Sequence, residues 1–441
     1  MTNPTDSGDP DVEQLRRRLH EAIPGGCHTY AKGDDQFPVD APALIARGRG
    51  CHVWDLEGRE YIEYGMGLRS VTLGHAFSPV VDAVRDALAL GTNFSRPSPM
   101  ELDCAETFLR LVPTAEMVKF CKDGSHAVDG AIRLARAHTG REIVAACAEH
   151  PFFSTGDWFI GTTPMSAGIP EATRRLVLPF RYNDLDALRG LFAQHPGQIA
   201  CVIMEAARLD EPAPGYLAGV RDLVHANGAL LVFDEMITGF RWNLHGAQHE
   251  YGVTPDLSAF GKAIANGFSV SAIAGRREIM QLGGSDHDRD RVFLLSTTHG
   301  AETHQLAAAI ATMSFHESNP VIETLAARGA RLRAGFDRAA RASGVEDHVA
   351  LMSRDCNLLF ATRDQQKAPS QPFRTLFMQQ LLRHGVIAPS FVVSYSHSEQ
   401  DIDHTIDAIG SALGVYRKAL DEGVDKYLVG RPVKPAFRRR A

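Results

Sequence analysis

The stretch Leu230-Leu231-Val232-Phe233-Asp234-Glu235-Met236 indicates the fold, because an unbroken apolar run ends directly in acidic residues. Residues 229–233 are apolar and numerous enough for a buried strand in the middle of a parallel sheet. Functional groups in such sheets project from the carboxyl ends of the strands, which is where Asp234 stands. Lys262 follows 28 residues later, in Phe260-Gly261-Lys262-Ala263. We therefore expect an α/β domain in which an acid and a lysine serve one active site.

This acid and lysine are compatible with more than one chemistry. A carboxylate such as Asp234 could bind a metal, act as a base or pair with a protonated pyridine nitrogen. The later Lys262, among small residues, favours the pyridine, because a Schiff-base lysine needs an aldehyde cofactor. A helix cap or a surface charge also often follows an apolar strand, and most lysines are solvated. The pair alone suggests pyridoxal 5'-phosphate (PLP) and leaves those readings open.

Composition places the chain among ordinary globular proteins and favours small-molecule chemistry. With 441 residues, 44% hydrophobic and 22% charged, it is long enough for two or three domains. The formal net charge of -7 includes no charged block apart from Arg438-Arg439-Arg440, so we expect no nucleic-acid or membrane partner. Seven scattered cysteines without a CxxC pair indicate neither disulfides nor a metal site. The start of the chain is polar and no run of 18 apolar residues occurs, which favours a cytoplasmic location.

The pattern of elements predicts three parts. Residues 1–10 are expected to be disordered, and residues 1–78 to contribute a helix at 12–22 and a β-meander at 51–62 to a small domain and an interface. Residues 79–315 alternate helices (80–90, 101–111, 126–137, 217–227) with apolar strands (118–121, 143–146, 199–204, 229–233), as a large parallel α/β domain does. Residues 316–441 read as a small α+β domain completed by the amino-terminal part.

Two further stretches suit a phosphorylated ring cofactor. Gly124 and Ser125 stand where a strand turns into a helix, and free N–H groups and a positive dipole end there can bind phosphate. An ordinary helix start capped by Asp123 or Ser125 is the alternative. In Pro151-Phe152-Phe153, an aromatic ring beyond the strand at 143–146 could stack on a pyridine ring, although both phenylalanines could equally belong to the core.

Taken together, these motifs resemble a known family. Residues 233–241 (Phe-Asp-Glu-Met-Ile-Thr-Gly-Phe-Arg), Pro255-Asp256 and residues 260–267 (Phe-Gly-Lys-Ala-Ile-Ala-Asn-Gly) are similar to the signature of class III PLP-dependent aminotransferases. The similarity extends over most of the chain and is greatest to the branch containing glutamate-1-semialdehyde 2,1-aminomutase. It implies the PLP-transferase fold type I, in which a mixed, mostly parallel sheet flanked by helices forms the large domain and the two termini form a smaller α+β domain.

The resemblance also implies roles for individual residues. Lys262 would form the Schiff base with PLP and move the proton during catalysis, while Asp234 would keep the pyridine nitrogen protonated. Other cofactor contacts are implied for Met236 and Phe152 on the two ring faces, Gly124 and Ser125 at the phosphate, Glu205 near cofactor and substrate, and Thr298 at the phosphate of a neighbouring subunit. Shared sites of this kind would make a homodimer obligatory.

The chain departs from the family pattern mainly on the substrate side. Lys32 replaces an arginine that holds a substrate carboxylate, and Gly67-Leu68-Arg69-Ser70 replaces a turn containing tryptophan. The usual Glu-Pro is Glu205-Ala206, and an acid of the phosphate turn is replaced by His126. A lysine lacks the bidentate fork that suits a carboxylate. These replacements leave the cofactor side intact, so they point to an altered substrate.

The remaining polar residues suggest the substrate class. Tyr30, Lys32 and Arg69 are the substrate candidates, and a polar mouth containing Asp34, Asp35, Gln36 and His28 suits a polyol or amino sugar. We therefore expect an enzyme that transfers an amino group, with L-glutamate as the expected donor, to the carbonyl of a sugar, aminocyclitol or related natural-product intermediate, as in amino-sugar or antibiotic biosynthesis. The alternatives are the aminomutase reaction on glutamate semialdehyde and an inactive PLP-fold binding subunit.

Overall fold

The computed structural model describes residues 12–439, so the disorder expected for residues 1–10 lies outside the described residues. The described chain forms two compact units. Unit 1 comprises residues 12–68, 73–76 and 324–438, and unit 2 comprises residues 69–72, 77–323 and 439. No helix among residues 12–439 is both long enough and apolar enough to cross a bilayer.

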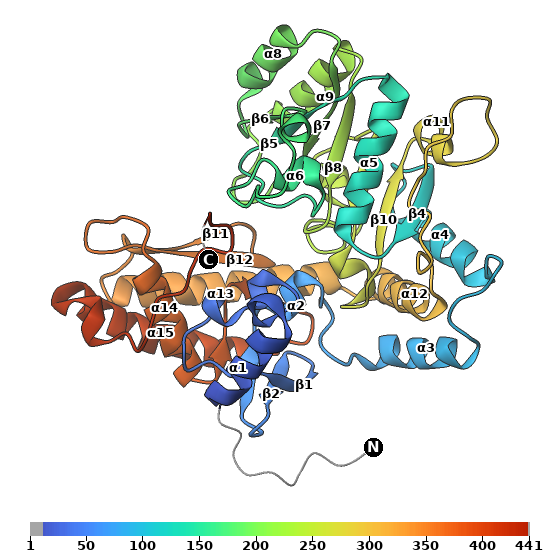
Figure 1. The fold of residues 1–441 in the computed structure, drawn as a ribbon. Helices are drawn as coiled ribbons and strands as arrows, with labels where there is room; N and C mark the ends of the chain where they lie inside the picture. The colour runs from blue at the N-terminus through green and yellow to red at the C-terminus, as the bar shows by residue number, and fades with distance from the viewer. Residues whose placement is uncertain (1–11, 440–441) are drawn as a thin grey trace. The chain divides into compact units, whose positions relative to one another are not determined.

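Unit 2 is built on one seven-stranded sheet (Figure 1). Its strands, in spatial order, are β4 (Met117–Cys121), β10 (Ser271–Gly275), β9 (Leu257–Phe260), β8 (Leu230–Asp234), β7 (Ile199–Met204), β5 (Ile143–Cys147) and β6 (Val177–Phe180). Strand β10 runs antiparallel to both of its neighbours, whereas β9, β8, β7, β5 and β6 are parallel. The sheet is thus mixed and mostly parallel, as predicted.

Helices cover both faces of this sheet, which explains why its central strands are apolar throughout. The helix α5 (Gly124–Thr139) shares a core cluster with Cys201 and Ile203 of β7. The next residues along β7, Val202 and Met204, point the other way into a cluster with α8 (Leu185–Gln194) and α9 (Tyr216–Ala226). The other helices of unit 2 are α3 (Ser78–Ala89), α4 (Pro99–Leu111), α6 (Asp157–Ile160), α7 (Glu171–Arg174), α10 (Ala247–Glu250), α11 (Arg277–Met280) and α12 (Thr303–Ser318).

Unit 1 contains two small sheets and its own apolar core. One sheet has the order β1 (Ile45–Arg49), β2 (His52–Asp55), β3 (Glu60–Glu63), β13 (Val386–Ile387), and the other has β11 (Val349–Met352), β12 (Asn357–Thr362), β14 (Phe391–Val392). Three long helices accompany them: α13 (Val321–Ala342, in unit 1 from Thr324), α14 (Gln371–Arg383) and α15 (Glu399–Glu422). Aromatic side chains such as Phe336, Phe377 and Tyr416 fill the core.

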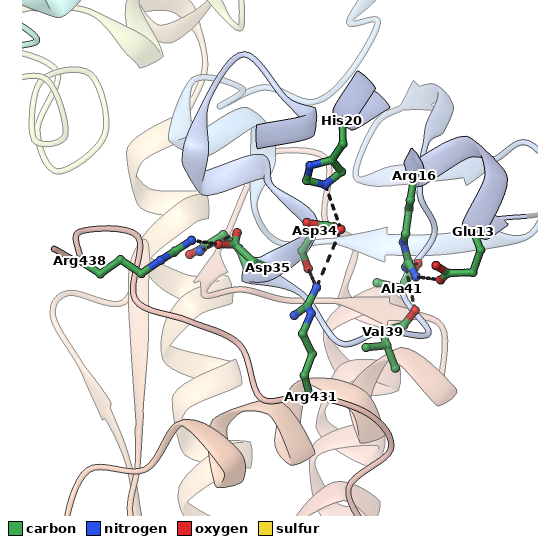
Figure 2. Close-up of polar contacts among 10 residues, drawn as sticks. Glu13, Arg16, His20, Asp34, Asp35, Val39, Ala41, Arg431 and Arg438 are labelled. Carbon is green, nitrogen blue, oxygen red and sulfur yellow. Dashed lines mark hydrogen bonds and ion pairs between the residues drawn. The ribbon is translucent and has the colours of Figure 1, made fainter. Parts of the chain in front are cut away.

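Polar contacts hold the amino-terminal segment inside unit 1 (Figure 2). From helix α1 (Val12–Ala22), Arg16 donates hydrogen bonds to the backbone oxygens of Val39 and Ala41 at 2.7 and 2.9 Å. Further along, Asp35 pairs with Arg438 of the carboxyl-terminal tail at 2.6 Å. Residues from the two ends of the described chain therefore stabilise one another.

Candidate active site

Strand register brings two buried carboxylates to the same edge of the sheet. In the parallel pair β7–β8, Met204 lies opposite Phe233, so the next residues, Glu205 and Asp234, emerge side by side at the carboxyl ends. Both side chains are buried. One oxygen of Asp234 accepts a hydrogen bond of 2.8 Å from the backbone N–H of Met236, which fixes the carboxylate at the strand end.

Lys262 lies near this edge because it follows the carboxyl end of the neighbouring strand β9. Asp234 is the register partner of Ala259 in β9, and Lys262 follows that strand within three residues, at the start of a short 3-10 turn, Lys262–Ala265. Its φ of +47° lies in the left-handed region, which costs a residue with a side chain about 1–3 kcal/mol. Backbone strain of this kind is typical of functional positions.

The buried charges perturb one another strongly. Burial, together with the Glu205 carboxylate, raises the pKa of Asp234 to about 7, and Lys262 opposes that rise. Burial lowers the pKa of the Lys262 amine, and the nearby Arg69 and Arg208 lower it further, whereas Asp234 and Glu205 act in the opposite direction. A buried carboxylate that is costly to ionise gains stabilisation from a cationic ring bound beside it. An amine with a lowered pKa releases its proton more easily, which suits proton transfer.

Arg208 is a member of this cluster that the sequence did not predict. Its Nη1 donates to Oε1 of Glu205 at 2.7 Å, and the guanidinium is largely shielded from solvent. The other carboxylate oxygen of Glu205, Oε2, is buried without a hydrogen-bond partner among the described residues. Arg208 follows Glu205 by three positions in a loop, where no periodic pattern predicts which side chains are buried. The one sequence signal was Ala206 in place of the family's proline, which indicates that this segment differs from the family pattern.

Arg69, a predicted substrate residue, also lies in this electrostatic environment. Burial, followed by Arg208 and Arg241, lowers the pKa of its guanidinium to about 10. Its backbone oxygen accepts a hydrogen bond from the fully buried Arg241, and the N–H of Thr72 donates to Oδ1 of Asn266 at 3.0 Å. Because Asn266 directly follows the lysine turn, these bonds tie the segment 69–72 to the turn that holds Lys262.

Glycines make room for Met236 on the cofactor side. A Cβ atom on Gly124 would lie 2.8 Å from Sδ of Met236, and one on Gly261 would lie 2.6 Å from the same atom. Real Cβ atoms essentially never approach so closely. The phosphate-turn motif and the lysine motif therefore both contain glycine at a position that packs against Met236, which is itself buried.

The predicted phosphate turn is the start of a helix that Asp123 caps, which is the alternative left open by the sequence, and phosphate binding there stays a prediction. Gly124 and Ser125 begin α5, and the Asp123 carboxylate caps the helix by accepting a hydrogen bond from the N–H of His126 at 3.1 Å. The exposed His126 ring also pairs with Asp123 at 3.1 Å, so it is a surface partner of the cap. The Ser125 hydroxyl accepts a hydrogen bond from the N–H of Thr155 at 3.0 Å, which joins the turn to the next loop.

That loop separates its two phenylalanines into different environments. Phe153 is buried in the core, whereas Phe152 is 43% exposed and meets Phe159 edge to face, with ring centroids 5.9 Å apart. The loop also carries His150, whose Nδ1 accepts a hydrogen bond from the N–H of Glu205 at 2.9 Å. Phe152 is thus the more exposed member of the pair, on a loop that is hydrogen-bonded to both Ser125 and Glu205.

Thr298 lies on the surface of unit 2. Its backbone oxygen accepts a hydrogen bond of 3.0 Å from the side chain of Asn93, and its own side chain is exposed. Shortly after it, Glu302 forms an ion pair with Lys122, the residue that precedes the phosphate turn. A role for Thr298 at a neighbouring subunit's phosphate stays a prediction.

The other two substrate candidates, Tyr30 and Lys32, belong to unit 1. Tyr30 is exposed, and Lys32 lines a cavity of about 430 Å³ within that unit. The polar residues expected beside them make internal contacts: Asp34 accepts a hydrogen bond from His20 and interacts with Arg431 (Figure 2), and the Gln36 amide donates to the Lys434 backbone oxygen. Asp34, Asp35 and Gln36 thus stabilise unit 1, which weakens the expectation of a polyol-binding mouth formed by these groups.

The residues of unit 2 fit PLP. A buried acid with raised proton affinity suits a ring nitrogen, and an amine with lowered proton affinity suits an aldehyde. The amino-terminal end of α5, with Ser125, suits a phosphate. The unpartnered Oε2 of Glu205 marks a buried polar position that a bound group can satisfy.

Comparisons with known proteins agree with this chemistry. A family model described as aminotransferase class-III matches residues 30–413. Glutamate-1-semialdehyde 2,1-aminomutase of Desulforudis audaxviator is 34% identical over 427 residues, covering 90% of this chain and 96% of that protein. The 3-aminobutyryl-CoA aminotransferase of Cloacimonas acidaminovorans is 31% identical over 416 residues, covering 92% and 97%.

A solved structure extends the agreement to the fold and the cofactor. The PLP form of the FumI protein from Sphingopyxis sp. MTA144 matches with a TM-score of 0.83 and 27% identity, covering 93% of this chain and 97% of that one. With the family model spanning most of the chain, the sheet-edge site and this PLP-containing structure lead to one conclusion. The chain belongs to the class III aminotransferases, which are PLP-dependent enzymes of fold type I.

Proposed function

We propose that this aminotransferase moves an amino group from L-glutamate, or another amino acid, to the carbonyl of a sugar, aminocyclitol or related natural-product intermediate. The observation that carries the proposal is the cluster of Lys262, Asp234 and Glu205 at adjacent strand ends, flanked by Arg69 and Arg208. The guanidinium groups of Arg69 and Arg208 act on Lys262, and Arg241 adds a further positive charge beside Arg69. Guanidinium groups favour a substrate that carries a carboxylate.

The residues divide the chemistry between them. Bound PLP withdraws electrons from the substrate carbon, which makes its C–H bond acidic. Lys262 would hold the aldehyde of PLP through its amine, with loss of water, and its nitrogen, whose pKa burial lowers, would carry a proton to or from the substrate carbon. Asp234 is placed to hold a proton on the ring nitrogen. We assign the phosphate to Gly124 and Ser125, and contacts with the ring faces to Met236 and Phe152.

The choice of acceptor rests on departures in the sequence. Lys32 in place of an arginine, and Ala206 in place of a proline, alter positions on the substrate side. Tyr30, Lys32 and Arg69 are proposed to contact the substrate, with Arg69 reading a donor carboxylate. A homodimer with shared sites is part of the proposal, with Thr298 at the partner's phosphate.

The aminomutase reaction is the second candidate, because relatives that cover nearly all of the chain are named for it. The two reactions are distinguished by adding L-glutamate to the PLP-loaded enzyme and following the absorbance of the lysine–PLP Schiff base. We expect glutamate to abolish this band and a sugar aldehyde or keto-cyclitol to restore it. No response to glutamate, together with turnover of glutamate semialdehyde alone, would establish the aminomutase instead.

A further inference from the structure

Glu205 is a second buried carboxylate next to Asp234, and its negative charge needs compensation. It stands beside Asp234 at the ends of two paired strands, and its charge raises the pKa of that acid further. Two adjacent buried carboxylates repel each other, so one of them tends to bind a proton unless a cation compensates it. Lys262 already compensates Asp234, which leaves Glu205 in need of a separate counter-ion.

Arg208 provides that counter-ion. Its Nη1 lies 2.7 Å from Oε1 of Glu205, a distance typical of a charge-assisted hydrogen bond between a guanidinium and a carboxylate. The backbone also constrains the acid, because the Glu205 N–H donates to Nδ1 of His150. Burial lowers the pKa of His150, so this imidazole is neutral and cannot replace the arginine. The Glu205–Arg208 pair therefore adds no net charge to the site.

We propose that Arg208 is a positioning residue which, by pairing with Glu205 at 2.7 Å, keeps this buried pair neutral and prevents the Glu205 carboxylate from holding a proton on the Lys262 nitrogen. The inference rests on the proposed role of Lys262 as the residue that holds PLP. The other charged groups that act on Lys262 are Asp234 and Arg69, with Glu235 beside Asp234 and Arg241 beside Arg69. None of these changes in the experiment, so the effect of the pair can be isolated.

The test is a pH titration of the Schiff-base absorbance in PLP-loaded variants. Arg208→Gln leaves an uncompensated carboxylate near Lys262, and we expect the midpoint to rise by about one pH unit. Glu205→Gln leaves an uncompensated guanidinium, and the midpoint is expected to fall by a similar amount. The double variant restores neutrality and should titrate close to the wild type.

Two controls separate charge from structure. Arg208→Lys keeps the charge and should titrate as the wild type does. Arg221→Gln removes a guanidinium that pairs with Asp222 on α9, and it should leave the midpoint unchanged. Midpoints that shift in the same direction in both single variants, or that do not shift at all, would overturn the proposal. If Arg208→Gln does not fold, the fall expected for Glu205→Gln alone decides the question.

The titration requires bound PLP but no turnover. If every acceptor in the substrate panel failed, the midpoints would still be measured, so failure of the proposed function and failure of this inference are distinguishable. As a second readout, the pH profile of the glutamate half-reaction should shift in the same direction as each midpoint.

Discussion

Lys262 combines a reactive amine with a backbone conformation that few residues with side chains adopt. Lys262 has a φ of +47°, and Asn266, at the end of the same turn, is also in the left-handed region. Such a conformation persists only where the surroundings fix it. Here the fully buried side chains of Ala263 and Ile264 anchor the turn in the core of unit 2. The backbone conformation of Lys262 therefore reduces the stability of the fold while it fixes the direction of the amine.

Two substitutions at Lys262 separate its chemistry from its strain. Lys262→Ala and Lys262→Gly should both reduce turnover by about 10⁴-fold or more, because the nucleophile and base is lost. Glycine adopts positive φ freely, so the Gly variant should be the more stable of the two by about 1 kcal/mol. Urea denaturation of the two proteins measures the difference. An Ala variant as stable as the Gly variant would show that the turn is unstrained.

Asp234 should make the stability of the PLP-free protein depend on pH. Burial raises its pKa to about 7, above the value of about 3.9 in an unfolded chain. An acid whose pKa is raised by folding reduces stability progressively as pH increases between these two values. Asp234→Asn removes this cost, so the Tm of the variant relative to the wild type should increase from pH 4 to pH 7 and then level off. A difference in Tm that does not change with pH would contradict the buried, costly carboxylate.

The proximity of Asp234 and Lys262, the two proposed catalytic residues, could be predicted from sequence because they stand at the ends of recognisable elements, whereas the position of Arg208 could not. Asp234 follows an apolar run, and Lys262 lies in a specific motif. Arg208 lies in a loop, where neither periodicity nor hydrophobicity predicts which side chains are buried. Its position follows only from the 2.7 Å bond to Glu205.

At the scale of elements, β7, β8 and β9 determine the site by their register. Each strand has a proposed site residue just at or beyond its carboxyl end, and parallel pairing places those ends together. The predicted strand at 199–204 and the helix at 12–22 have the same bounds in the structure. Strands β9 and β10 were not predicted, because short runs of small residues such as Ser271–Gly275 give no clear β signal. The antiparallel direction of β10 likewise follows from tertiary pairing.

Packing between elements gives a prediction at Gly124. Replacing it with alanine would bring the new Cβ within 2.8 Å of Sδ of Met236, and because the end of this flexible side chain can shift, we expect a loss of only about 1 kcal/mol of stability. Gly190→Ala in α8 is the matched control, because nothing lies within 4 Å of its Cβ. In the Met236→Ala background the Gly124→Ala penalty should largely disappear. Equal penalties in the two backgrounds would show that Met236 is not the obstacle.

At the scale of the whole molecule, unit 2 exposes apolar side chains near the Thr298 segment. Leu90 and Phe94 are 76% and 52% exposed, and Asn93 between them bonds to the Thr298 backbone. Exposed apolar groups gathered near a predicted shared site suit a subunit interface. The predicted division at residues 78/79 and 315/316, in contrast, stays a prediction.

The proposed dimer gives a further test. Replacing Leu90 and Phe94 together with aspartate would place charge in the proposed interface, and we expect monomers in sedimentation velocity and weakened PLP retention. Leu56→Asp, at an exposed turn of unit 1, is the control and should not change the sedimentation coefficient. A double variant that sediments like the wild type would place the interface elsewhere.

The most direct test of the site is to locate PLP on the chain. Borohydride reduction of the purified holoenzyme converts a lysine–PLP Schiff base into a stable amine, and mass spectrometry of the peptides then identifies the modified residue. We predict a single modification, at Lys262. It should be absent from the Lys262→Ala variant. Modification of another lysine, or none in protein that retains PLP, would contradict an active site built at the carboxyl ends of β7, β8 and β9.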